Sequence, residues 1–189
     1  MTSNLVEQGY SQMQLRYIET PQGHLYRKDY QIIKRAFDLT LCLIALPPLL
    51  LVMGIVSILI YIDNPGPVMF KQQRTGKGGQ RFGIYKFRTM VTNAEELKKT
   101  YAHLNELTWP DFKITNDPRI TRIGRILRKT SLDEIPQLIN VINGEMSLVG
   151  PRPTSFDVST YSLWHTERLE VIPGITGLWQ VKGRSNVDF

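Results

Sequence analysis

An apolar segment near the N-terminus sets the first limit on how this chain can fold. Leu39 to Ile62 is a run of 24 residues without a charged side chain, and Asp38 and Asp63 bracket it. A straight helix rises about 1.5 Å per residue, so a helix of this length would cross the roughly 30 Å hydrocarbon core of a bilayer. The segment therefore predicts a membrane element.

Two consecutive prolines, Pro47 and Pro48, lie inside this segment. Each lacks a backbone N–H and clashes with the preceding helical turn, so we expect a sharp kink or break. A break would leave Leu39–Leu46 and Leu49–Ile62, which reach roughly 12 Å and 21 Å as helices. Neither piece crosses a bilayer alone.

Basic side chains flank the apolar segment on both sides. They are Arg27, Lys28, Lys34 and Arg35 before it, and Lys71, Arg74, Lys77 and Arg81 after it. Because basic flanks are retained on the cytoplasmic side, the pattern favours a re-entrant helical hairpin that enters and leaves from the cytoplasm. A kinked spanning helix is the main alternative. A buried hairpin in a soluble protein fits less well, because the run is so apolar.

The rest of the chain predicts an α+β fold that is mostly helical. Asn64–Pro67 is a turn, and strands near 68–70 and 82–88 form a small antiparallel β-hairpin. Helical patterns cover parts of 94–107, 118–129 and 135–142, the last stopped by Asn143-Gly144. The length of 189 residues suits one domain and its core.

Composition narrows the chemistry. The formal net charge of +6 indicates anionic partners, such as phosphates, nucleic acid or an acidic membrane surface. With Cys42 as the single cysteine, neither an intrachain disulfide nor a cysteine zinc site can form. No Walker A loop or dinucleotide-binding glycine pattern is present, so ATP hydrolysis and nicotinamide chemistry lack support.

The basic residues gather in two places. In the second predicted strand, Lys86 and Arg88 point to the same face, where they can grip one phosphate or bind lipid headgroups. Further on, arginines recur at every third position, a basic stripe that needs an anion or carboxylates nearby. The stripe consists of Arg119, Arg122, Arg125 and Arg128.

The carboxylates nearest the stripe are Asp133 and Glu134. One interpretation is structural, because Ser131 and Glu134 have the spacing of an N-terminal capping box. The other is catalytic: the basic surroundings keep a carboxylate ionised and attract phosphates, and an ionised carboxylate can attack phosphorus with Mg²⁺ offsetting the repulsion. The residues alone do not decide between these two interpretations.

An ordered set of motifs carries a resemblance to a known family. The motifs are Lys34-Arg35-x-Phe37-Asp38, the apolar segment, Pro65-Gly66-Pro67, Tyr85-Lys86-Phe87-Arg88-Thr89-Met90, Ser131-Leu132-Asp133-Glu134, Gly150-Pro151-Arg152-Pro153 and Pro173-Gly174-Ile175-Thr176-Gly177. Over residues 30 to 189 the chain resembles the bacterial sugar transferase family, the monotopic polyprenyl-phosphate phosphoglycosyl transferases. Each motif is weak alone, but their order is specific.

The resemblance implies a two-step transfer. Asp133 would attack the β-phosphate of a UDP-sugar, with Glu134 as its partner and Mg²⁺ bridging Asp133 and the diphosphate. Undecaprenyl phosphate would then take the sugar phosphate, initiating polysaccharide or glycoconjugate synthesis at the cytoplasmic face of a bacterial inner membrane. The resemblance places a phosphate contact at Arg128, phosphate or structural roles at Lys86 and Arg88, and uridine contacts at Pro151, Arg152 and Pro153. From the basic stripe, Arg119 is a further candidate for substrate binding.

The resemblance also implies a domain plan. Residues 1–28 form a polar segment, 29–63 an interfacial and re-entrant membrane helix, and 64–189 a cytoplasmic catalytic domain. The family usually breaks its membrane helix at Ser-Pro, where this chain has Pro47-Pro48. Relatives usually continue beyond the position of Phe189, so we expect a C-terminally shortened catalytic domain.

Two other functions remain open from the sequence. A non-catalytic membrane-surface protein would use the basic residues for lipid headgroups and Asp133-Glu134 for helix capping. A nucleic-acid-binding protein would use the basic stripes, but it poorly explains the apolar segment. The sequence identifies neither the transferred sugar nor the oligomeric state, and a homodimer is left open.

Overall fold

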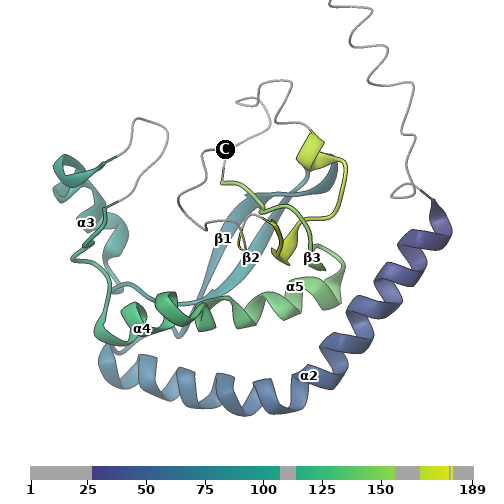
Figure 1. Cartoon of the computed structure of the whole chain (residues 1–189). Helices are drawn as coiled ribbons and strands as arrows, with labels where there is room; N and C mark the ends of the chain where they lie inside the picture. Colours follow the sequence, from purple (N-terminus) through teal and green to yellow (C-terminus); the bar gives the residue numbers. More distant parts are fainter. Residues whose placement is uncertain (1–26, 107–113, 156–166, 179, 181–189) are drawn as a thin grey trace, which may run out of the picture. The chain divides into compact units, whose positions relative to one another are not determined.

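The structure is a computed structural model that describes residues 27–106, 114–155, 167–178 and 180 (Figure 1). The chain divides into two units, residues 1–37 and 38–189. The predicted polar segment 1–28 falls almost entirely outside the described residues and stays a prediction.

The described helices and strands confirm a mostly helical chain with a small antiparallel sheet (Figure 1). In chain order they are α2 (Lys28–Asp63), β1 (Met69–Thr75), β2 (Arg81–Phe87), α3 (Ala94–Thr100), α4 (Arg122–Thr130), α5 (Leu138–Asn143), β3 (Ser147–Val149) and β4 (Gly174–Thr176). Short 3-10 helices lie at η2 (Lys77–Gly79), η3 (Ala102–Leu104) and η4 (Leu132–Gln137).

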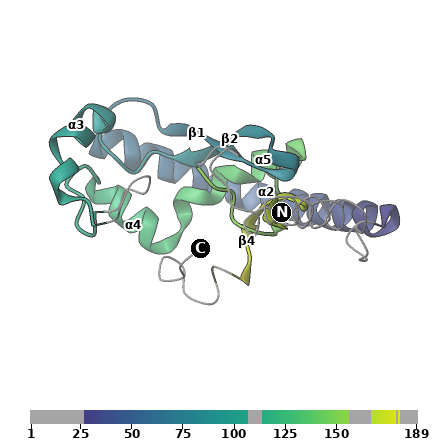
Figure 2. The ribbon, with the colours of Figure 1, turned by 90° about the horizontal axis from the view of Figure 1, so that it is seen from above.

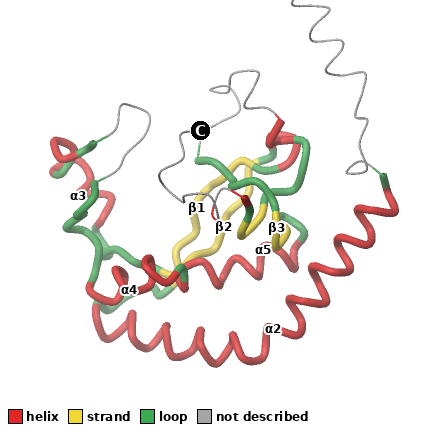
Figure 3. The backbone as a smooth tube through the Cα atoms, in the orientation of Figure 1, coloured by secondary structure: helices red, strands yellow, loops and turns green. Residues whose placement is uncertain are grey.

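The apolar segment forms most of α2, which continues through both prolines. Pro47 and Pro48 lie inside the helix, and Figure 3 draws it without an interruption. The expected break into two separate helices is therefore not observed, but α2 changes direction along its length, as the expected kink requires (Figure 1). Each proline lacks only its own backbone N–H, so the other residues of the helix can still donate hydrogen bonds to the carbonyls of the preceding turn. The predicted re-entrant hairpin is not confirmed by this helix.

Within residues 38–189, α2 presents one stripe to the rest of the domain. The buried apolar residues Cys42, Val56 and Ile60 recur at helical spacing, with Leu49 and Val52 partly buried between them. Cys42 belongs to a cluster with Ile84 and Val141, and Val56 and Ile60 to a second cluster with Phe87 and Leu127. The helix thus forms one wall of the domain core along most of its second half.

Two carboxylates at the ends of this stripe fix α2 to the domain. Asp38 is buried and accepts a hydrogen bond from Ser147 Oγ at 2.7 Å. Asp63 Oδ2 accepts from the backbone N–H of Ile123 at 3.0 Å, and so satisfies a free donor in the first turn of α4. Both acids that bracket the apolar segment are therefore structural anchors.

The strands β1 and β2 form the predicted hairpin. They pair antiparallel from Met69 opposite Phe87 to Thr75 opposite Arg81, and Figure 2 shows them side by side from above. The tight connection contains Gly78 and Gly79, whose φ angles of 63° and 77° favour glycine. Ile84 and Phe87 are both buried but lie on opposite faces of β2, in two different core clusters, and Lys86 shares the face of Ile84.

A second sheet was not predicted from the sequence. The short strands β3 and β4 pair in parallel, Ser147 with Gly174 and Val149 with Thr176. Gly150 and Gly174 pack so closely that a side chain on either would collide with the backbone of the other. This close pairing positions the loop 150–153 that follows β3.

Candidate active site

The two carboxylates follow a sharp reversal at the end of α4. Ser131 adopts a left-handed conformation (φ 60°, ψ 17°), which ends α4 and starts η4 with Asp133 and Glu134 in its first turn. In the part of the chain that the structure describes, the Ser131 side chain makes no capping hydrogen bond to η4. The predicted capping box is therefore wrong, and capping does not explain the acid pair.

Lys86 holds the acid pair from strand β2. Its Nζ lies 2.7 Å from Glu134 Oε1 and 4.0 Å from Asp133 Oδ2. The side chains of Lys86, Asp133 and Glu134 are only 17%, 13% and 15% exposed, so the ion pair is screened less than a surface pair. The structure therefore joins two sequence motifs that are 48 positions apart.

Burial controls the protonation of Asp133. It raises the pKa of the Asp133 carboxyl above its ordinary value, and the neighbouring Glu134 adds to the rise. Lys86 and Arg128 act in the opposite direction and do not cancel the effect of burial. Burial therefore outweighs the basic surroundings in the direction of this pKa shift, and a bound cation would favour the ionised form.

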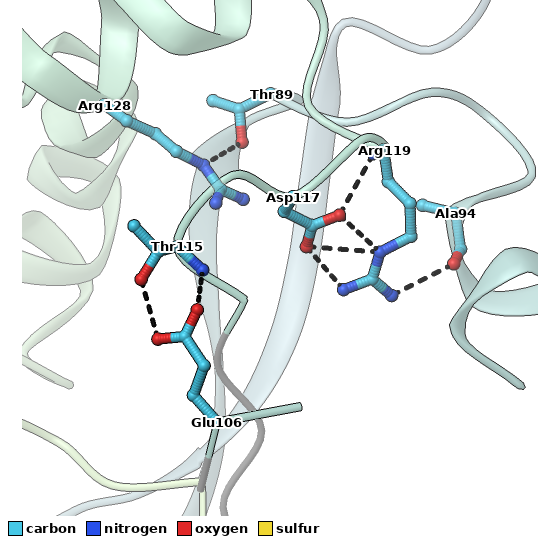
Figure 4. Close-up of polar contacts among 7 residues, drawn as sticks. All are labelled: Thr89, Ala94, Glu106, Thr115, Asp117, Arg119 and Arg128. Atoms are coloured by element: carbon cyan, nitrogen blue, oxygen red, sulfur yellow. Dashed lines mark hydrogen bonds and ion pairs between the residues drawn. The ribbon is translucent and has the colours of Figure 1, made fainter. Parts of the chain in front are cut away.

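Arg128 reaches the same region from α4. Its Nε donates to Thr89 Oγ1 at 2.9 Å, as Figure 4 shows. Desolvation lowers the pKa of the guanidinium, while the charges of Asp133 and Asp117 raise it. Arg128 is therefore tied to the loop after β2 and acts electrostatically on Asp133.

The structure places the predicted phosphate ligand Arg119 in a buried ion pair. Arg119 Nη2 and Nε lie 2.7 Å and 2.9 Å from the two carboxylate oxygens of Asp117, and Nη1 donates to the Ala94 carbonyl at 3.3 Å (Figure 4). The pair lowers the pKa of Asp117 and raises that of Arg119, chiefly through these hydrogen bonds. This arrangement orders the loop before α4.

Arg88, the other predicted phosphate ligand, is also buried. Its Nη2 donates to the Asn64 carbonyl in the turn after α2, and burial lowers the pKa of the guanidinium. Lys86 and Arg88 therefore have different partners within the protein, and a shared phosphate stays a prediction. Contacts of Arg88 and Arg119 with substrate stay predictions that no observation here tests.

The loop Pro151-Arg152-Pro153 borders two neighbouring hollows. The outer cavity has a volume of about 330 Å³ and is lined by Val149, Gly150, Pro151, Arg152, Arg168, Gly177 and Leu178. The inner pocket is much smaller, with a volume of about 10 Å³, and is lined by Arg74, Ile84, Lys86, Glu134, Gln137, Arg152, Pro153, Gly174 and Ile175. Arg152 lines both, so the loop and the acid pair meet at one site.

The oxygen donors suit a magnesium ion bound together with a substrate. Within the described ranges, no group of three or more His, Cys, Asp or Glu side chains forms a closed metal site. Mg²⁺ keeps several waters and binds through one or two carboxylates plus substrate phosphates. Asp133 and Glu134, adjacent on η4 and largely but not fully buried, match that requirement in number and chemistry.

Sequence reasoning missed two residues at this site, Asn140 and Gln137, and placed Arg74 only in a general run of basic residues. Asn140 is fully buried and bonds the backbone of Gly83 and Tyr85, so it fixes β2 against α5. Gln137 and Arg74 line the inner pocket. The signal available was weak: each is a single polar residue outside a recognisable motif.

Comparisons with known proteins place these residues in context. The sequence model of the family described as "Bacterial sugar transferase" matches residues 29–189. "Galactosyl transferase CpsE" of Streptococcus agalactiae is 45% identical over 86% of this chain and 36% of its own length. "Undecaprenyl-phosphate galactose phosphotransferase" of Salmonella typhimurium is 44% identical over 89% of this chain and 36% of its own.

A shorter relative is covered more fully. "Exopolysaccharide production protein ExoY" of Sinorhizobium fredii is 42% identical over 84% of this chain and 72% of its own length. The chain thus spans about a third of the two longer relatives and most of the shorter one.

Proposed function

Because this chain belongs to the bacterial sugar transferase family, we propose that it transfers a sugar 1-phosphate from a UDP-sugar to undecaprenyl phosphate. The observation that carries the proposal is the joined site: Lys86, Asp133 and Glu134 converge beside a pocket that Arg152 and Pro153 also line. The names of the relatives, which include an undecaprenyl-phosphate sugar phosphotransferase, support the acceptor.

Asp133 is the proposed nucleophile. One of its carboxylate oxygens forms a bond to the β-phosphorus of the UDP-sugar, the bond from that phosphorus to the bridging oxygen breaks, and UMP leaves with the bond electrons. An oxygen of the lipid phosphate then attacks the same phosphorus, and the aspartyl–phosphorus bond breaks. The carboxylate is regenerated, so the cycle balances without a further reactant.

The neighbouring side chains prepare this attack. Lys86 sits between the two acids, pairs with Glu134 and favours the ionised form of Asp133. Glu134, held at 2.7 Å by Lys86, is the proposed partner that keeps the lysine in place. A bound Mg²⁺ would supply charge neutralisation between carboxylate and diphosphate.

A membrane position for the site is part of the proposal. Among the described residues, α2 is the one helix long and apolar enough to cross a membrane. Within residues 38–63 many large apolar side chains are exposed, a pattern typical of lipid contact. They are Leu41, Leu43, Ile44, Leu50, Leu51, Ile55, Ile58, Leu59, Tyr61 and Ile62.

The packing of α2 supports a re-entrant rather than a spanning helix. Residues Cys42 to Ile60 press one stripe against the domain that carries the polar site. A transbilayer path for this segment would draw buried polar groups such as Asp38 and Ser147 into the hydrocarbon layer, at a high cost. We therefore propose that α2 enters and leaves on the cytoplasmic face of a bacterial inner membrane.

The proposed function is tested by UMP release. The full chain, extracted in detergent, is incubated with Mg²⁺ and a panel of UDP-sugars, with and without undecaprenyl phosphate. Lipid-dependent UMP release that disappears in Asp133→Asn and on chelation of the metal supports the proposal and identifies the sugar. Equal release by Asp133→Asn and the unaltered chain would contradict it.

A further inference from the structure

The inner pocket contains more hydrogen-bond donors than the protein satisfies. It joins the acid pair, at Lys86 and Glu134, to the loop at Arg152 and Pro153. Three cationic side chains line it, those of Arg74, Lys86 and Arg152, against the single carboxylate of Glu134. Glu134 already pairs with Lys86 at 2.7 Å, so this carboxylate is not the partner of the buried Arg74.

Two buried N–H donors at this pocket have no acceptor among the described residues: Nε2 of Gln137 and Nε of Arg74. Gln137 is 2% exposed, and it follows Pro136 at the end of η4. The two other nitrogens of Arg74 are engaged, with Nη2 bonding Gln72 Oε1 at 2.6 Å and Nη1 bonding Ser155 Oγ. Buried donors without partners are rare in native proteins, so both require an explanation.

The electrostatics of the pocket point to an anionic acceptor. The pKa of Arg74 is lowered to about 10, chiefly by burial and next by the charge of Arg152. Arg74 remains protonated at neutral pH, close to another cation. An anion with several acceptor oxygens would satisfy both the charges and the two free donors.

We propose that Arg74 and Gln137 bind the α-phosphate of the UDP-sugar, the phosphate that leaves as UMP, an assignment that rests on the proposed function. The β-phosphate is assigned to the acid pair and the uridine to Pro151-Arg152-Pro153, and the α-phosphate joins these two groups of the substrate. Lys86 and Glu134 of the acid site and Arg152 and Pro153 of the loop line one pocket. Arg74 and Gln137 line the same pocket, and each has a buried N–H donor without an acceptor among the described residues.

This position gives the two residues a role in the first chemical step. When the bond from the β-phosphorus to the bridging oxygen breaks, negative charge grows on the oxygen that stays with the α-phosphate. N–H donors held close to this oxygen stabilise such charge, and the inner pocket widens to admit the phosphate. Arg74 and Gln137 are therefore expected to affect UMP affinity and the rate of UMP release together.

The test measures the binding of UMP and of uridine to the full chain by calorimetry. Gln137→Leu removes the amide donor, and Arg74→Lys keeps the charge but removes Nε. Each variant should bind UMP about tenfold or more weakly, as expected for a lost hydrogen bond to a charged group, and should bind uridine as the unaltered chain does. Matched controls are Gln73→Leu and Arg125→Lys, which alter exposed residues and should change neither affinity.

Uridine separates a lost phosphate contact from a damaged fold. A variant that keeps uridine binding and loses UMP binding supports the inference. If Gln137→Leu also loses uridine binding, the comparison of UMP affinity with uridine affinity in Arg74→Lys decides the question. Unchanged UMP affinity in folded variants, with lipid-dependent UMP release intact in the unaltered chain, would overturn this inference alone. An unaltered chain that neither binds UMP nor releases it from any UDP-sugar would overturn the proposed function as well.

Discussion

Lys86 Nζ lies 2.7 Å from Glu134 Oε1, across 48 positions of the sequence. The same nitrogen is 4.0 Å from Asp133 Oδ2, so the lysine is shared unequally between the two acids. The nearer contact fixes Glu134, while the farther one leaves Asp133 free to approach another group. This asymmetry is what allows two adjacent carboxylates to take different roles.

Removal of the Lys86 charge should move the pH dependence of UMP release. Lys86 lowers the pKa of Asp133, which burial raises, so Lys86→Met should raise that pKa further. The ionised fraction then falls at any given acidic pH, and the acidic limb of the profile shifts to higher pH. We also expect the rate at neutral pH to fall about a hundredfold, as for loss of an electrostatic donor.

The control for this variant is Lys71→Met, which alters a lysine on the same hairpin that lies 5.0 Å from the Tyr85 ring centroid. The acidic limb of its pH–rate profile for UMP release should lie at the same pH as in the unaltered chain. A limb that stays in place in Lys86→Met, or moves to lower pH, would contradict the assigned electrostatic role.

Asp133→Asn should stabilise the fold at neutral pH. The folded-state pKa of Asp133 is raised by burial, so the folded protein binds a proton more readily than the unfolded chain. The ionised carboxylate therefore costs stability above this pKa, and the cost disappears as the pH falls below its ordinary value. Thermal unfolding should show a higher Tm for Asp133→Asn at pH 7 and a smaller difference near pH 4.

Glu134→Gln should have the opposite effect at neutral pH, because it leaves Lys86 without its close partner. If both variants shift the Tm in the same direction, the unequal sharing of Lys86 does not describe the site.

Arg119→Gln should act on stability rather than on substrate affinity. It leaves Asp117 as an unpaired carboxylate with 5% of its side chain exposed, a change that typically costs about 3–5 kcal/mol. The stabilisation by this pair exists above the ordinary pKa of an Asp and is lost as the pH falls through the lowered pKa of Asp117.

The measurements for Arg119→Gln are denaturant unfolding and the KM for the UDP-sugar at a temperature where the variant is folded. An unchanged KM is expected. A KM increase without a loss of stability would restore Arg119 as a direct phosphate ligand.

Gly124→Ala should weaken the packing of α4 on the loop after β2. A Cβ at this position would collide with the backbone carbonyl of Thr89, which also accepts from Thr121 N at 3.1 Å. We expect a loss of 1–3 kcal/mol, roughly the usual cost of overpacking. Gly54→Ala is the matched control: among the described residues no atom lies within 4 Å of its added Cβ. Equal unfolding free energies for the two variants would argue against this contact.

The sequence predicted the parts of the fold that depend on local pattern. The long run without charged side chains located α2, and the alternation of side-chain types located the hairpin that carries Lys86. The acidic pair Asp133-Glu134 was recognised by its position beside basic residues. Each of these signals arises within one segment, so it can be recognised without knowledge of the segments that pack against it.

Other features depended on tertiary contacts that no local pattern encodes. The spacing of Ser131 and Glu134 indicated a capping box, but the left-handed Ser131 and the reach of Lys86 gave Glu134 another partner. The bonds of Arg88 to Asn64 and of Arg119 to Asp117 also depend on the fold and could not be predicted from the sequence. The parallel pairing of β3 and β4 joins three-residue segments too short to be recognised from sequence.

The central claim is that Asp133 carries the sugar phosphate covalently. The most direct test is the intact mass of the full chain after incubation with Mg²⁺ and its UDP-sugar, without lipid, followed by peptide mapping. The account predicts a sugar-phosphate adduct on Asp133, formed together with about one UMP per chain. The adduct should be absent in Asp133→Asn and should disappear when undecaprenyl phosphate is added. Lipid-dependent UMP release without an adduct, or an adduct on another residue, would contradict the account.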